Sequence, residues 1–182
     1  MNAIVHTAAG AAIGPVVAEA VLSRIGQTPI GTGLAMGSAF VANFLLHPLF
    51  DNVAHWDFNL MRPPPPGTDL PDTDKSKATI PEYISVVVDG VGSIALAIWL
   101  WSRFGHQPAM LWGSAGAVLP DLFSWTPGMS PWIIEHTPYR WYHRFHERFH
   151  FPLNWSQRWY TIIAPIGTLI LFMWILFLRY GA

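Results

Sequence analysis

Two imidazoles and two carboxylates gather in eleven residues that close a long apolar run. The stretch reads His47-Pro-Leu-Phe-Asp51-Asn-Val-Ala-His55-Trp-Asp57. On a helix, His47, Asp51 and His55 follow at intervals of four residues, so their side chains stack along one face. Imidazole and carboxylate side by side are ligands for zinc, manganese or iron. The spacing therefore predicts part of a metal site, which other segments must complete.

The chain that positions these residues is too apolar for an ordinary soluble domain. It has 182 residues, ten tryptophans, 12% charged residues and a mean hydropathy of +0.31. Its long apolar runs predict one all-α integral membrane domain over residues 1–182. The net charge of −1 provides no excess of positive charge for binding nucleic acid. The absence of cysteine excludes disulfides and cysteine-ligated zinc. The first 22 residues lack a cationic start, so we expect no cleaved signal peptide.

Five apolar runs predict a polytopic bundle. We expect spans at about residues 3–22, 29–50, 82–102, 109–123 and 159–178. The first carries Gly10 and Gly14, whose spacing lets helices approach closely in a bilayer. The fourth is short for a crossing of about 20 residues, so we expect it to be tilted, re-entrant or extended by its ends. Residues 61–80 are rich in proline and in mixed charges, which predicts a solvated loop.

The order of the spans brings the candidate ligands to one membrane face. Consecutive spans alternate direction, so the start of the first, the end of the second, the start of the third and the end of the fourth share one side. His6, Asp89 and Asp121 therefore lie on the same side as the 47–57 stretch. Seven of the ten lysines and arginines also lie there, so the positive-inside rule places this side in the cytoplasm.

The three aspartates in or at the ends of spans need a positive partner. An ionised group within a span is costly, and the helix dipole already places negative charge at the helix C-termini where Asp51 and Asp121 lie. No lysine or arginine is close in sequence to Asp51, Asp89 or Asp121. A divalent cation would supply the missing charge to all three.

A second group of histidines lies on a predicted amphipathic helix over residues 138–150. His143, His146 and His150 fall within a sector of roughly 60°. We expect this face to join the ligand cluster. Arginines form a separate stripe that faces water or phosphate: Arg140, Arg144 and Arg148.

Each candidate also has a structural alternative. His6 could be a helix-packing histidine, Asp89 could hydrogen-bond to a neighbouring helix, and Asp121 could belong to a helix-end turn. The arginines could serve only membrane topology or lipid headgroups, and the histidine helix could be a pH-sensitive surface stripe.

Four short motifs resemble the membrane-bound metal-dependent hydrolase-like proteins. They are His6-Thr-Ala-Ala-Gly10, the 47–57 stretch, Leu119-Pro120-Asp121 and His143-Arg-Phe-His146. This family is similar to the LexA-binding inner-membrane hydrolase group and, more distantly, to zinc-dependent phospholipase C. The resemblance implies a small bacterial inner-membrane protein with a divalent metal, zinc first and manganese or iron as alternatives. The implied ligands are His6, His47, Asp51, His55, Asp121 and the pair His143 and His146. Glu147 and the proline-rich loop depart from the family pattern.

The leading hypothesis is a hydrolase that cleaves a lipid ester or phosphoester at the membrane surface with one or two metal ions. Asp89 and His150 complete the candidate metal ligands. Asp57 or Glu147 would move a proton as general base or acid. A substrate phosphate would be held by the arginine stripe, Arg140, Arg144 and Arg148.

Two alternatives remain open. The run from His143 to His150 loosely resembles the histidine boxes of membrane hydroxylases and desaturases, which hold two irons mostly with histidines. Only one such box is present here, and the first cluster is half carboxylate. A small five-span protein could instead be a non-catalytic accessory subunit of a larger membrane complex. Iron content and oxygen dependence would reveal the first alternative, and co-purification with a large assembly the second.

Overall fold

The part of the chain that the computed structural model describes is helical throughout its regular structure. It covers residues 3–51, 66–67, 79–105, 107–125, 129–148 and 159–181. The helices are α1 (Ala3–Ile25), α2 (Pro29–Phe50), α3 (Ile80–Arg103), α4 (Pro108–Trp125), α5 (Met129–His136), α6 (Tyr139–His146) and α7 (Tyr160–Tyr180). The prediction of an all-α membrane bundle of about five spans is confirmed.

Local sequence signals explain where two of the long helices begin. The Thr28 hydroxyl accepts a hydrogen bond from the Gly31 N–H at 3.0 Å, and a proline follows it at the first helical position of α2. At the start of α3, the Glu82 carboxylate accepts a hydrogen bond from the Thr79 N–H at 2.5 Å. This cap lets α3 begin two residues before the predicted span.

Four helices are long and apolar enough to cross a membrane. They are α1, α2, α3 and residues 162–180 of α7. Large apolar side chains lie exposed along these helices, and on α3 Val87, Val91 and Ile94 are each 62–64% exposed. Such a surface is unfavourable in water and favourable against lipid tails, as expected for an integral membrane protein.

Helix α4, which matches the predicted fourth span, is the packing centre of the bundle. Its 18 residues rise about 27 Å, slightly less than a hydrocarbon core of about 30 Å. It crosses α1 at backbone contact, because a Cβ built on Gly113 would lie 2.1 Å from the Gly10 carbonyl oxygen. It also meets α2 closely, since a Cβ on Gly116 would lie 2.2 Å from the Phe40 carbonyl oxygen. Glycine is therefore required at both crossings.

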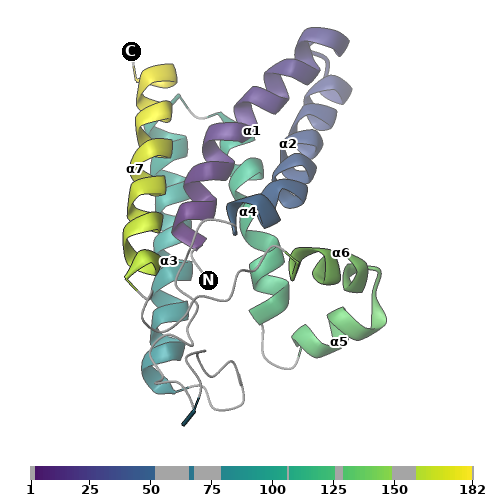
Figure 1. Ribbon diagram of the computed structural model, residues 1–182. Helices are drawn as coiled ribbons and strands as arrows, with labels where there is room; N and C mark the ends of the chain where they lie inside the picture. The colour runs from purple at the N-terminus through teal and green to yellow at the C-terminus, as the bar shows by residue number, and fades with distance from the viewer. Residues whose placement is uncertain are drawn as a thin grey trace.

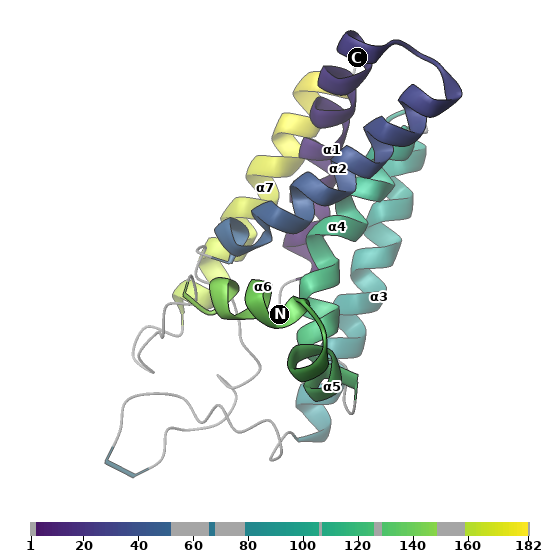
Figure 2. The same ribbon diagram turned by 90° about the vertical axis from the view of Figure 1, so that its right-hand side faces the viewer.

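The ends of the helices place many polar residues at one end of the bundle. The starts of α1, α3 and α7 and the ends of α2 and α4 all point toward the lower part of Figure 1, and the C-terminus lies at the upper end. Helices α5 and α6 lie at the lower end as well. Figure 2 shows α6 running across the lower half of α4, below the end of α2. This arrangement sets α6 beside the 47–51 segment.

Candidate metal centre

Five ionisable side chains from four segments meet in one buried cluster. His6 comes from α1, His47 from α2, Asp51 from the residue that follows α2, Asp121 from α4 and His146 from α6. Each of these residues is at most 5% exposed. The structure thus brings together five of the nine predicted metal ligands.

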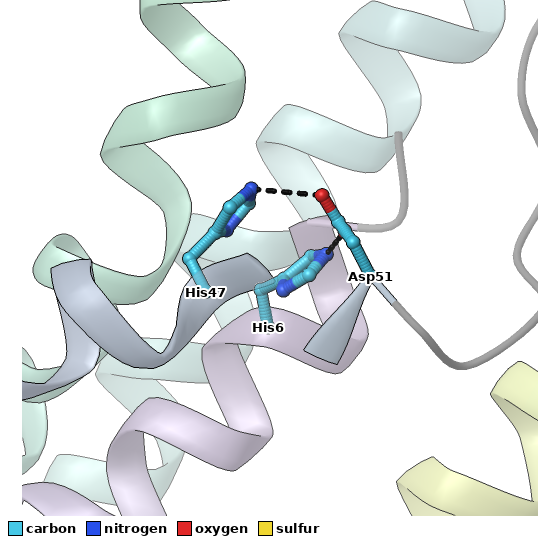
Figure 3. A group of neighbouring side chains, drawn as sticks. All are labelled: His6, His47 and Asp51. Carbon is cyan, nitrogen blue, oxygen red and sulfur yellow. Dashed lines mark ion pairs between the residues drawn. The ribbon is translucent and has the colours of Figure 1, made fainter. Parts of the chain in front are cut away.

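Asp51 is the centre of the cluster. Its Oδ1 lies 3.0 Å from His6 Nε2, and its Oδ2 lies 3.1 Å from His47 Nε2 and also contacts His146 Nε2. Figure 3 shows the His6 and His47 rings directed at this carboxylate. Burial alone would raise the pKa of the Asp51 carboxyl, but the three imidazoles around it hold that pKa well below its usual range. Asp51 is therefore ionised within the cluster.

Asp121, from α4, lies beside these donors. Its Oδ1 lies 3.5 Å from His47 Nε2, and its Oδ2 lies 3.8 Å from His6 Nε2. Tetrahedral zinc, with bonds to nitrogen and oxygen of about 2.0–2.1 Å, places neighbouring donors about 3.3 Å apart. The four separations of His6 and His47 from the two carboxylates run from 3.0 to 3.8 Å. His6, His47 and Asp51 could hold a small cation, with Asp121 beside it.

The ring of His47 is oriented as a ligand. Its Nδ1 lies 2.6 Å from the Ala117 carbonyl oxygen, which can only accept, so Nδ1 carries the proton. The Nε2 lone pair then faces the two aspartates. His47 Nε2 and Asp121 Oδ2 are both buried and form no hydrogen bond with any residue that the structure describes. Buried polar atoms of this kind call for a partner, and an imidazole fixed by a backbone carbonyl is typical of metal sites.

The charge of the cluster also fits a cation. Two carboxylates are buried there, and burying ionised groups without a counter-charge is costly. The six arginines in the described ranges are all exposed: Arg24, Arg103, Arg140, Arg144, Arg148 and Arg179. The buried group of His6, His47 and Asp51 could hold a metal ion.

Two tyrosine hydroxyls fix α6 on the bundle. Tyr142 donates to the Phe44 carbonyl oxygen at 2.6 Å, and Tyr139 donates to the Pro120 carbonyl oxygen at 2.9 Å. Phe44 lies four residues before Pro48, which has no N–H to offer that carbonyl in the helix. Burial raises the pKa of Tyr139 to about 12 and also raises the pKa of Tyr142, so both hydroxyls keep the protons that they donate.

We expect Tyr142→Phe to weaken binding of a divalent metal ion by about tenfold, the lower end of what outer-shell partners of metal ligands contribute. The ring of Tyr142 would keep its contact with Phe44, at 4.5 Å between centroids, but the bond that fixes α6 near His146 would be lost. Competition with a chromophoric chelator in detergent measures the affinity. Tyr83→Phe, at an exposed position on α3, is the control. Equal affinities in the two variants would show that the hydroxyl does not position the cluster.

Asp89 requires a correction, because the structure places it outside the cluster. Its Oδ2 accepts a hydrogen bond from the Ala3 N–H at 2.8 Å, and its Oδ1 accepts one from the Ile4 N–H at 3.2 Å. The first amides of a helix have no partner within the helix, and the dipole favours a negative charge there. Asp89 therefore caps α1 from α3, as in the structural alternative, and we remove it from the ligand set.

The remaining predicted residues of α6 lie beside the cluster or on its exposed side. His143 is half-buried, with Nε2 3.8 Å from Glu147 Oε1, and these two residues and His146 form a second group that could hold a metal ion. The arginine stripe is exposed, and the guanidinium carbons of Arg140 and Arg144 lie 5.1 and 5.7 Å from the Trp141 ring centroid. Three predicted residues fall outside the described ranges: His55, Asp57 and His150.

Two contributions were not anticipated from the sequence. The Ala117 carbonyl carries no side-chain signal, and only the packing of α2 on α4 reveals that it orients His47. Tyr142 does have a signal, since it precedes His146 by four residues and so shares its helix face.

No family model, curated protein or solved structure matches this chain.

Proposed function

We propose that the protein is a membrane-embedded hydrolase that uses a divalent metal ion to cleave a lipid ester or phosphoester. The observation that carries the proposal is the buried convergence of His6, His47, Asp51, Asp121 and His146 at one end of a bundle of apolar helices. Each of the four motifs that resemble the membrane-bound metal-dependent hydrolase-like proteins contributes at least one of these residues.

The donor set favours zinc. Imidazole nitrogen and carboxylate oxygen suit Zn²⁺, with Mn²⁺ and Fe²⁺ as alternatives, and donor separations near 3.3 Å suit a compact site. A divalent ion held there would act as a Lewis acid and lower the pKa of a bound water toward neutrality. The ligands would be His6, His47, Asp51 and His146, with Asp121 adjacent.

The residues around the ligands supply the proton transfer. Glu147 is half-exposed and lies one helical turn after His143, directly following His146 in the chain, so its carboxylate can exchange protons with solvent. It would accept a proton from the attacking water and return it to the leaving group. Asp57 is the second candidate for this role.

The position of the cluster supports a lipid substrate. It lies where the chain leaves the apolar helices, which is the level of lipid headgroups and ester bonds. The distribution of lysine and arginine favours a cytoplasmic location for this end, and the resemblance implies a bacterial inner membrane.

The test is a hydrolysis assay on protein purified in mild detergent and loaded with zinc. Short-chain phospholipids serve as substrates, and released fatty acid and phosphate monoester are both measured. We expect hydrolysis that stops on chelation, returns with zinc, and falls at least about 100-fold in Glu147→Gln, which keeps its zinc. A zinc-loaded protein that hydrolyses neither type of bond would contradict the proposal. Bound iron with oxygen consumption would favour the hydroxylase alternative.

A further inference from the structure

A pocket lies between α5 and α6, separate from the metal cluster. The chain forms a pocket of about 280 Å³ there, and none of the five cluster residues lines it. Its size is slightly below the range of about 300–1,000 Å³ that holds drug-sized ligands, so it suits a headgroup rather than a whole lipid. The lining residues are Glu135, His136, Thr137, Pro138, Arg140 and Trp141.

The pocket presents both signs of charge without pairing them. Glu135 and Arg140 both line it, yet neither forms an ion pair with the other or with any other described residue. The guanidinium of Arg140 lies 5.1 Å from the Trp141 ring centroid, so the cation and the aromatic ring form one side of the pocket together. A ligand that carries both a negative and a positive group could pair with Arg140 and Glu135 at once.

His136 adds a polar group to the anion side. Its Nδ1 lies 3.1 Å from the Trp132 carbonyl oxygen, which can only accept, so Nδ1 is the protonated nitrogen. Nε2 then carries the lone pair in the neutral ring and becomes a second donor when the ring is protonated. His136 can therefore add a charge-assisted hydrogen bond to an anion beside Arg140.

The surroundings of the pocket are those of a membrane interface. Trp132 and Trp141 are 58% and 62% exposed, and they stand on the helix pair that joins the end of α4 to the start of α7. Tryptophan is enriched at the depth of lipid headgroups, where its ring is partly apolar and partly hydrated. The pocket thus lies where phospholipid headgroups are the most abundant ligands.

We propose that the α5–α6 pocket binds the headgroup of a zwitterionic phospholipid. The phosphate lies against Arg140 and His136, and the ammonium group lies against the Glu135 carboxylate. Arg140 lines the pocket, whereas Arg144 does not, although its guanidinium also lies over the Trp141 ring. The site uses none of the metal ligands, and it takes only Arg140 from the arginine stripe, so it can be tested without the metal.

The test measures binding of soluble short-chain lipids to full-length protein stripped of metal by a chelator, so that failure here is distinct from failure of the hydrolase. Dihexanoyl phosphatidylcholine is the zwitterionic probe, dihexanoyl phosphatidylglycerol the anionic one, and inorganic phosphate the third. Isothermal titration calorimetry reports the affinities. We expect the zwitterionic lipid to bind at least about tenfold more tightly than either of the others.

The variants assign the two charges. Arg140→Gln should weaken binding of both lipids about tenfold, whereas Glu135→Gln should remove only the preference for the zwitterion. Arg103→Gln is the matched control, because the Arg103 guanidinium also lies over an aromatic ring, that of Phe104, but at the other end of the bundle. It should change neither affinity. Both lipids binding equally, inorganic phosphate binding as tightly as the lipid, or equal losses in Arg140→Gln and Arg103→Gln would each overturn the proposal. Thermal unfolding verifies that these exposed substitutions leave the fold intact.

Discussion

Asp51→Asn should purify with less than about a tenth of the metal content of the unchanged protein. Among the described residues, Asp51 touches the Nε2 atoms of all three imidazoles of the cluster. The amide has nearly the same shape but no negative charge, so a divalent ion loses its principal counter-charge. Because outer-shell changes alone cost 10–100-fold in metal affinity, loss of a direct ligand should cost at least about 100-fold.

The matched control for this substitution is Asp89→Asn. It makes the same chemical change in a carboxylate that caps α1, and the remaining amide oxygen can still accept from the Ala3 N–H. Metal content should therefore stay at the original level. Elemental analysis after size-exclusion chromatography measures both variants, and circular dichroism monitors helix content. Equal metal content in the two variants would contradict the role of Asp51 as the central metal ligand. It would also call for a new test of Asp89 as a ligand.

Gly113→Leu should destabilise the whole bundle by more than about 3 kcal/mol, the upper end of what overpacking commonly costs. The first atom of the new side chain would lie 2.1 Å from the Gly10 carbonyl oxygen, and that atom belongs to backbone, which cannot rotate away. The crossing of α1 and α4 would have to widen. His6 and Asp121, which are carried by these two helices, would then separate, and metal binding would fall together with stability.

Gly33→Leu is the control, because no described atom lies within 4 Å of a Cβ built at that glycine. It lies inside α2, where leucine is favoured over glycine by up to about 1 kcal/mol, so stability should be unchanged or slightly raised. Thermal unfolding in detergent, followed by tryptophan fluorescence, compares the two variants. A Gly113→Leu protein that unfolds at the original temperature with its metal retained would show that the close crossing is not needed.

The bundle and much of the cluster follow from the sequence because a bilayer restricts the choices. Apolar runs of span length must become helices, and consecutive spans must reverse direction. Those two rules are sufficient to place His6, His47, Asp51 and Asp121 at one end. The Gly10 and Gly14 spacing predicted a close crossing, and the structure has one at Gly10.

Side-chain direction is what those rules leave undetermined. His143 and His146 fall in the same narrow sector of a helix, and only the docking of α6 decides that His146 is 2% exposed while His143 remains half-buried. Asp89 lies toward the same end of the bundle as the cluster, as predicted. Its carboxylate accepts hydrogen bonds from the free amides at the start of α1 and does not join the cluster.

Two irregular features could not be predicted from the sequence either. The short helix α5 carries no strong periodic signal and was not anticipated. The bond between Tyr142 and Phe44 depends on a carbonyl that Pro48 leaves without its helical donor, and a sequence does not reveal which hydroxyl takes that donor's place.

The most direct test of a shared metal ion is the composition of the gently extracted protein after incubation with zinc. Elemental analysis and X-ray absorption should find about one zinc per chain, with nitrogen and oxygen ligands at about 2.0–2.1 Å and an imidazole signature. His6→Ala and His146→Ala, at distant points of the chain, should each remove that same ion. Less than half an ion per chain in the unchanged protein, or full occupancy in both variants, would contradict it.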